Sequence, residues 1–300
     1  MTNMENTESK NSFPYLKTGA NTKVGSYRWS VCALLFFATT IIYVDRQALG
    51  ILAPVLQKDI GWNEIQYGYI VAAFTAAYAI GLLISGRVID SVGTKIGYLV
   101  SVFIWSIAAM GHALATSVFS FGVARFSLGL GESANFPAAI KAIAEWFPKK
   151  ERAYATGWFN AGPNVGVIFA SLMVPWITLT WGWQAVFIFI GLLGFIWMFF
   201  WWWIYELPEN HKKISREEIA YIHADQNESE TESIPWLRLL KYRQTWSFVA
   251  GKFLTDPVWW FYIYWLPKFL NHRFGLDLAH LGLPLIVIYT MTGIGSVGGG

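Results

Sequence analysis

Four ionisable side chains lie inside long apolar stretches of this chain: Asp45 and Arg46 in the first, and Arg125 and Glu132 in a later one. A charged side chain at the centre of a bilayer costs about 2.5–3.5 kcal/mol on insertion scales, so such residues indicate a functional site. Guanidinium groups bind carboxylates through paired hydrogen bonds. A carboxyl that loses water favours its protonated form, although a nearby arginine opposes this. The four residues therefore predict a path for an organic anion and a proton.

Depth along each helix predicts separate roles for these residues. At about 1.5 Å of rise per residue, Glu132 falls near the midplane, and Arg46 and Arg125 fall in the same outer half. We expect Arg46 to hold a substrate carboxylate and Glu132 to exchange the proton. Arg125 and Asp45 are their expected charged partners, and Asp45 is a second candidate proton site. In the alternative, Asp45 with Arg46 and Arg125 with Glu132 are ion pairs that only hold helices together.

The composition is that of a membrane protein. Hydrophobic residues make up 55% of the 300 residues and charged residues 14%, which is too few to cover a water-facing surface. The net charge of +3 is too small and dispersed to favour a nucleic-acid partner. Cys32 is the only cysteine, which excludes an internal disulfide and a thiolate metal cage, and we expect no cofactor. The motifs of hydrolases and metalloenzymes are not apparent, so we do not expect an enzyme.

Continuous apolar runs of roughly 20 residues predict an all-α integral membrane protein rather than a β-barrel. The expected spans are about 29–54, 66–86, 96–115, 118–142, 154–178, 183–205 and 245–267, with an eighth that begins near 281. Lys and Arg concentrate in the N-terminal tail and in the connections 86–95, 143–153 and 206–244. By the positive-inside rule, these segments and the N-terminus are expected on the cytoplasmic side of an inner membrane.

These spans divide the chain into four parts. We expect a flexible tail over 1–28, a six-helix bundle over 29–205, a cytoplasmic linker over 206–244 and a partial second bundle over 245–300. In the linker, Ser215 followed by Glu218 is a capping signature, and it precedes a stripe of isoleucines. A short amphipathic helix is therefore expected there. Tyr78 in the second span and Asn164 in the fifth fall at a depth similar to the buried charges, either as ligands or as interhelical hydrogen bonds.

Several motifs resemble a known family. The connection after the second span, with Gly86, Asp90 and Gly93, resembles the signature loop of the major facilitator superfamily, although Ser91 and Thr94 replace two of its basic residues. The segments 43–46, 131–137 and 145–153 resemble the anion:cation symporter family, and 256–267 is most similar to its hexuronate transporters. The resemblance covers 29–300. It implies two six-span halves, so we expect the chain to be truncated in the eighth span.

The resemblance also implies a function. In the family it suggests, Arg46 holds the substrate carboxylate, Glu132 is protonated for symport, and Tyr43, Tyr78 and Asn164 line the cavity. The motif of Gly86, Asp90 and Gly93 acts as a cytoplasmic gate. Trp259, Tyr262 and Trp265 either stack on or hydrogen-bond a sugar ring, or are lipid-facing or packing aromatic residues.

We therefore expect a monomeric secondary transporter that imports a hexuronate, such as glucuronate or galacturonate, with protons by alternating access. The alternatives are a carrier of another organic anion, an anion antiporter, and a non-transporting receptor or scaffold of the same fold. Antiport is an alternative because Gly157, Gly162, Pro163 and Gly166 in the fifth span partly resemble an antiporter pattern, although they also suit packing and a hinge.

Overall fold

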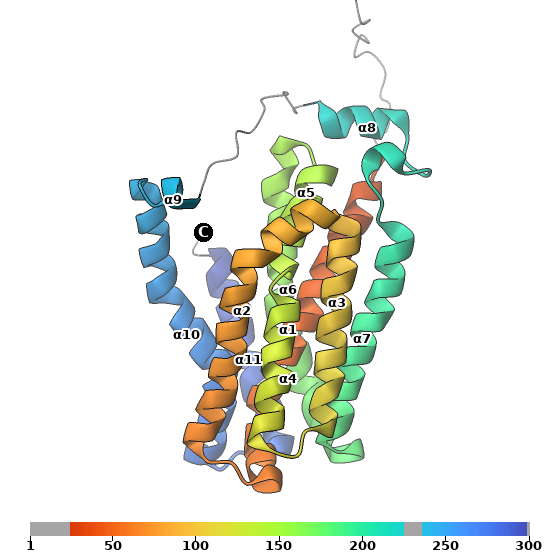
Figure 1. Ribbon diagram of the computed structural model, residues 1–300. Helices are drawn as coiled ribbons and strands as arrows, with labels where there is room; N and C mark the ends of the chain where they lie inside the picture. Colours follow the sequence, from red (N-terminus) through yellow and green to blue (C-terminus); the bar gives the residue numbers. More distant parts are fainter. Residues whose placement is uncertain (1–24, 225–235, 299–300) are drawn as a thin grey trace, which may run out of the picture.

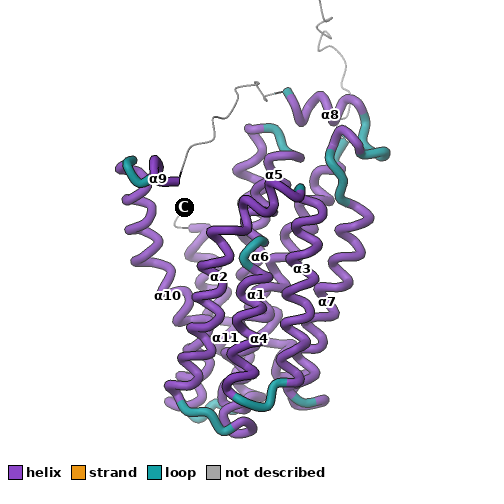
Figure 2. The backbone as a smooth tube through the Cα atoms, in the orientation of Figure 1, coloured by secondary structure: helices purple, strands orange, loops and turns teal. Residues whose placement is uncertain are grey.

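The computed structural model describes residues 25–224 and 236–298, which form a helical bundle (Figures 1 and 2). Within those ranges no strand occurs, and the predicted all-α fold is confirmed. Almost all of the tail expected over 1–28 lies outside the described residues. The helices are α1 (Tyr27–Ile60), α2 (Glu64–Val92), α3 (Thr94–Gly111), η1 (His112–Leu114), α4 (Val118–Glu132), α5 (Asn135–Trp146), α6 (Lys149–Trp181), α7 (Trp183–Ile204), η2 (Pro208–Asn210), α8 (Arg216–His223), α9 (Trp236–Leu239), α10 (Arg243–Phe274) and α11 (Leu278–Gly298).

Six helices in the described ranges are long and apolar enough to cross a membrane: α1, α2, α3 with η1, α6, α7 and α11. The other two expected spans are present as helices that differ from the prediction. The fourth is divided between α4 and α5, and α10 includes Lys252, Asp256 and Lys268. Helix bounds also extend past the apolar runs. For example, α1 continues to Ile60, where Gly61 in a left-handed conformation (φ +80°) ends it.

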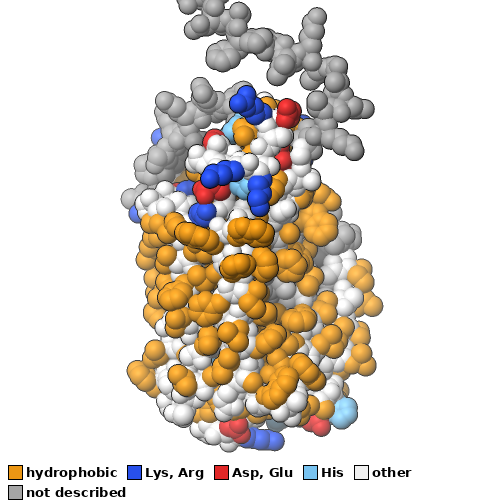
Figure 3. All heavy atoms as spheres, turned by 90° about the vertical axis from the view of Figure 1, so that its right-hand side faces the viewer, with side chains coloured by type: hydrophobic (Ala, Val, Ile, Leu, Met, Phe, Trp, Pro, Cys, Tyr) orange, Lys and Arg blue, Asp and Glu red, His pale blue; other side chains and the backbone are white. Residues whose placement is uncertain are grey.

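An apolar belt surrounds the bundle. On the face shown in Figure 3, hydrophobic side chains cover the middle, and charged side chains gather at the two ends. Large exposed residues in this belt include Leu83, Phe103 and Ile196, which are 60%, 48% and 55% exposed. A water-soluble monomer rarely exposes so continuous an apolar surface, whereas a membrane protein must.

The span expected over 118–142 is present as two successive helices, because α4 ends at Glu132 and α5 begins at Asn135. Proline lacks a backbone N–H, so Pro137 cannot donate to the carbonyl of Ser133 in an α-helix. The Ser85 hydroxyl of α2 donates to that carbonyl instead, at 3.3 Å. Ser101 of α3 likewise donates to the carbonyl of Gly131 at 2.6 Å. The break makes Glu132 the last residue of α4, and α5 lies beyond it toward the end of the bundle where α8 lies (Figure 1).

Helix α1 lies inside the bundle and packs along α6, α7 and α10. Glycines on α6 allow its closest approach. A Cβ at Gly162 would lie 2.9 Å from the carbonyl oxygen of Phe36, and one at Gly166 would lie 2.4 Å from that of Thr40 and 3.0 Å from the Cβ of Tyr43. The packing role expected for the glycines of the fifth span is therefore confirmed for Gly162 and Gly166 but not for Gly157, where no atom lies within 4 Å of a Cβ position.

Replacing Gly166 by alanine is expected to destabilise the protein by about 1–3 kcal/mol, because the added methyl overpacks the α1–α6 contact. Gly157 on the same helix is the matched control, since no atom lies within 4 Å of a Cβ built there. Gly157→Ala should be neutral or stabilising by up to about 1 kcal/mol through helix propensity. Thermal unfolding of both variants in detergent measures the difference, and equal midpoints would contradict this packing.

The last two helices contact the earlier ones near the end of the bundle opposite α8. We call the end where α8 lies the linker end (Figure 1). Tyr67 of α2 donates to the carbonyl of Tyr264 at 2.7 Å, and Lys268 pairs with Glu64 at 2.5 Å. Toward the linker end, the residues of α10 from Arg243 to Val258 are almost all exposed. The second part of the chain thus contacts the first at the end opposite α8 and along α6, on which α11 packs, whereas the first half of α10 is exposed.

Candidate functional site

Charged side chains from α1 and α4 meet inside the bundle. Arg46 Nε donates to Glu132 Oε2 at 2.7 Å, and Arg125 Nη1 lies 3.3 Å from Asp45 Oδ1. All four residues are at most 2% exposed. Arg125 and Glu132, seven residues apart, both face α1. The sequence-based alternative paired Asp45 with Arg46 and Arg125 with Glu132, whereas in the structure Arg46 pairs with Glu132 and Arg125 with Asp45, so each ion pair joins α1 to α4.

Four rings surround the guanidinium of Arg46, and we call them the Arg46 aromatic cluster. Their centroids lie 4.6 Å (Tyr78), 4.9 Å (Tyr43), 5.1 Å (Trp260) and 5.3 Å (Phe74) from its Cζ atom. A desolvated cation–π contact contributes about 2 kcal/mol, so these rings stabilise the charge of Arg46 in a site that excludes bulk water. They come from α1, α2 and α10 and thus join both parts of the chain.

The guanidinium of Arg46 keeps donors for a ligand. Among the described residues, its hydrogen bonds run from Nε to Glu132 alone. The two terminal nitrogens can therefore take a carboxylate in the paired geometry that guanidinium groups favour. A groove of about 760 Å³ between α2 and α10 is lined by Trp260 and Tyr264, and it reaches the Arg46 aromatic cluster.

The second ion pair has few hydrogen bonds. Within the described ranges, both carboxylate oxygens of Asp45 and all three side-chain nitrogens of Arg125 are buried without a hydrogen-bond partner. Oε1 of Glu132 and the hydroxyl of Tyr264 share this state. Buried polar atoms usually have a partner, so this concentration indicates a site that accepts water or ligand.

The other predicted aromatic and polar residues lie at different places. Trp259 packs against Tyr43, with ring centroids 6.2 Å apart, beside the Arg46 aromatic cluster. Asn164 is half-buried on α6 and faces α11, where a Cβ at Gly293 would lie 3.8 Å from its amide. Tyr262 is 38% exposed and is not among the rings around Arg46. Its ring packs against the neighbouring Phe261.

Sequence reasoning missed Phe74 and Trp260. Phe74 precedes Tyr78 by one helical turn, and their rings stack at 5.9 Å, so the spacing of four was a usable signal. Trp260 lies between Trp259 and Tyr262 in a run of aromatic residues, where spacing does not distinguish one face of the helix from another. Trp260 stacks on Tyr264 at 5.7 Å and takes the place beside Arg46 that Tyr262 does not.

Gly86 and Asp90 lie in the last turns of α2, and Gly93 joins α2 to α3 at the linker end. Gly93 has a positive φ of +89°, which a residue with a side chain rarely adopts, and it donates to the carbonyl of Ile89 at 3.0 Å. Asp90 pairs with Lys141 of α5 at 2.9 Å. Gly86 has no atom within 4 Å of a Cβ position, so no close packing requires a glycine there.

Further hydrogen bonds and an ion pair connect helices at the same end of the bundle. Thr94, which replaces a basic residue of the motif, donates to Glu145 at 2.8 Å, and Tyr205 donates to the same carboxylate. Lys95 donates to Glu206 at 2.7 Å, and this contact holds the pKa of the Glu206 carboxyl below its usual range. The start of α3 is thereby joined to the ends of α5 and α7.

Known proteins resemble this chain over most of its length. The Major Facilitator Superfamily matches residues 35–300. The chain is 34% identical over 265 residues to a galacturonate transporter of Dickeya chrysanthemi, covering 87% of this chain and 77% of the relative. It is 35% identical over 265 residues to a hexuronate transporter of Escherichia coli (strain K12), covering 87% of this chain but only 61% of the relative.

Solved structures share the fold. A bacterial homolog to the human lysosomal transporter Spinster, inward-facing and unoccupied, superimposes with a TM-score of 0.73 at 20% identity, over 91% of this chain and 62% of that one. A D-xylose-proton symporter gives a TM-score of 0.63 at 14% identity, over 91% and 68%. The expectation of a transport protein rather than an enzyme is confirmed. The chain belongs to the major facilitator superfamily and is a multi-pass membrane transporter.

Proposed function

We propose that the protein of this chain imports a sugar acid, a hexuronate such as galacturonate or glucuronate, together with a proton by alternating access. The observation that supports this most is the buried Arg46, which is surrounded by rings, bonded to Glu132 and still able to donate to a carboxylate. The galacturonate and hexuronate relatives support the substrate class.

Competition for Arg46 would couple the two solutes. A substrate carboxylate on Arg46 replaces part of the charge that Glu132 supplies. Once Arg46 also binds the substrate, the negative charge of the buried Glu132 is less well compensated, so its protonated form is favoured. Asp45 and Arg125 lie beside this exchange as a second ion pair, which balances the charge of the site and offers Asp45 as another proton acceptor. The rings of Tyr43, Tyr78 and Trp260 contact the sugar ring.

The proposal includes an orientation. Lys95, Lys149, Lys150 and Lys213 lie in helices or loops at the linker end, which the positive-inside rule places in the cytoplasm. The N-terminus is then cytoplasmic, the membrane is a bacterial inner membrane, and the protein acts as a monomer. The tail, six-helix bundle, linker and second bundle remain the proposed domains.

Uptake into proteoliposomes that contain the full-length protein tests this function. Labelled galacturonate should accumulate when the outside is made acidic, and unlabelled glucuronate should compete, whereas neutral galactose should not. Competition only by other organic anions would favour a different substrate, and uptake that requires a preloaded anion and does not respond to the pH gradient would favour antiport. Absence of any uptake or exchange would refute a carrier and favour a receptor or scaffold.

A further inference from the structure

The short helix α8 packs against the linker end of the bundle and buries a charged residue there. It has two buried residues, Glu218 at 2% exposure and Ile222 at 0%. The Ser215 side chain accepts from the backbone N–H of Glu218 at 3.2 Å and so caps the helix. A buried glutamate is costly unless it is paired, so the contacts of Glu218 are informative.

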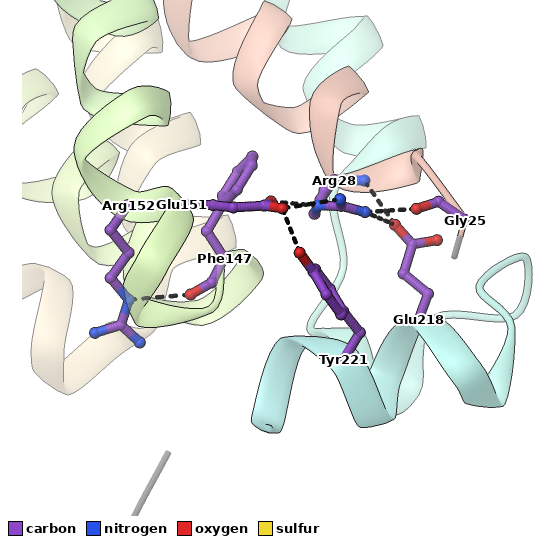
Figure 4. Close-up of polar contacts among 7 residues, drawn as sticks. All are labelled: Gly25, Arg28, Phe147, Glu151, Arg152, Glu218 and Tyr221. Atoms are coloured by element: carbon purple, nitrogen blue, oxygen red, sulfur yellow. Dashed lines mark hydrogen bonds and ion pairs between the residues drawn. The ribbon is translucent and has the colours of Figure 1, made fainter. Parts of the chain in front are cut away.

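One cation, Arg28, connects three helices at this place (Figure 4). Its Nε lies 2.9 Å from Glu151 Oε2 on α6, and its Nη1 lies 3.2 Å from Glu218 Oε1 on α8. Arg28 is itself only 7% exposed. Tyr221 of α8 points back to the same group and donates to Glu151 at 2.5 Å, as Figure 4 shows.

Glu218 also completes the start of α1. The N-cap residue of α1, Ser26, makes no side-chain capping hydrogen bond. The backbone N–H of Arg28, one of the unpaired donors of the first turn, donates to Glu218 Oε1 at 3.3 Å. A carboxylate at a helix N-terminus also interacts favourably with the helix dipole. Side chain and backbone of Arg28 therefore bind the same carboxylate, which belongs to a different helix.

We propose that Arg28 is a positioning residue that anchors α8 to α1 and α6, so that α8 moves with α1–α7 as one body throughout the transport cycle. The inference rests on the proposed function, because it assigns α8 to one of the two moving parts. The opposite behaviour is a gate, in which α8 must leave α1 in one state of the cycle. The two behaviours differ in the effect of a covalent link between α8 and α1.

A disulfide provides that link. In a Cys32→Ser background, which removes the only native cysteine, Gly25→Cys and Glu218→Cys are combined. A Cβ built at Gly25 lies 3.5 Å from the Cβ of Glu218, within the range of disulfides at about 3.5–4.5 Å. The reduced protein lacks the Glu218 carboxylate and should take up substrate several-fold more slowly than the Cys32→Ser parent. Oxidation should restore uptake, whereas an oxidised protein that is inactive until dithiothreitol is added would overturn the proposal.

A second measurement reports docking without transport. Ile222→Cys in the same background places a thiol at a fully buried position of α8, and maleimide labelling measures its exposure. Adding Arg28→Ala or Glu218→Gln should speed labelling by about tenfold, because each leaves a charge unpaired. Glu217→Gln is the matched control, since the neighbouring Glu217 is exposed, and should leave the rate unchanged.

Equal labelling rates in all variants would overturn the anchor role. If the parent itself takes up no sugar acid, the proposed function fails, and the labelling rates alone decide whether Arg28 holds α8.

Discussion

Replacing Arg46 by alanine is expected to reduce sugar-acid uptake by at least about a hundredfold. Two hydrogen bonds from a guanidinium to a carboxylate contribute about 1.5–3 kcal/mol each, and both would be lost. The substitution also leaves Glu132, which is 1% exposed, without its partner. Uncompensated burial of that charge would favour protonated Glu132 even without substrate, so the remaining transport should no longer respond to the pH gradient.

Arg46→Lys separates charge from geometry. Lysine keeps the positive charge but binds as a point charge without the planar fork. We expect it to raise KM by about tenfold, with a smaller loss of kcat than in Arg46→Ala. Initial rates of galacturonate uptake over a range of concentrations measure both constants.

Arg87→Ala is the matched control for the loss of an arginine, because Arg87 is exposed near the end of α2 and should leave KM unchanged. A normal KM in Arg46→Ala, with the protein still eluting as a single species in detergent, would contradict the assignment of Arg46.

The helical bundle could be predicted from sequence because each long apolar run must bury its backbone hydrogen bonds within itself. The break after Glu132 was less accessible. Pro137 was visible, but prolines occur inside α1, α6, α10 and α11 without dividing them. What differs at Ser133 is a hydroxyl from another helix, Ser85, that takes over the freed carbonyl. That contact depends on how α2 and α4 pack.

The pairing of the buried charges was likewise not predictable from sequence, because it depends on how two helices pack. Composition and depth were enough to nominate Arg46 and Glu132, because few side chains other than functional ones carry charge at that depth. Which arginine binds which carboxylate depends on the register between α1 and α4. Asp45 and Arg46 are adjacent in sequence but about 100° apart around the helix, so each meets a different level of α4. Sequence spacing within one helix does not include that information.

The aromatic residues of α10 show that sequence also does not predict which side of a helix faces the site. Trp259, Trp260 and Tyr262 lie in a run that is aromatic on every side, so no periodicity marks a buried face. Only the contact with α2 brings Trp260 beside Tyr78 and Arg46 and leaves Tyr262 exposed.

Replacing Glu132 by glutamine is expected to abolish proton-driven accumulation while preserving exchange of substrate. Glutamine has the same shape, and its carbonyl oxygen can still accept from Arg46 Nε, so the binding site should keep its geometry. The amide cannot take up a proton, so substrate binding is no longer linked to protonation at this position. Each unit of pH across the membrane corresponds to about 1.4 kcal/mol per proton, or about tenfold accumulation.

Two assays on the same proteoliposomes separate these effects. With a pH lower by about one unit outside, the parent should accumulate galacturonate several-fold and at most about tenfold if one proton moves with each substrate, whereas Glu132→Gln should only equilibrate. In counterflow, with unlabelled substrate inside and no pH gradient, both should take up label. Glu217→Gln is the matched control, because Glu217 is exposed on α8, outside the site, and should keep the accumulation of the parent. Accumulation by Glu132→Gln equal to that of the parent would move the proton site to another carboxyl. Asp45→Asn would then be the next variant to test, since Asp45 is the other buried carboxylate paired with an arginine at this site.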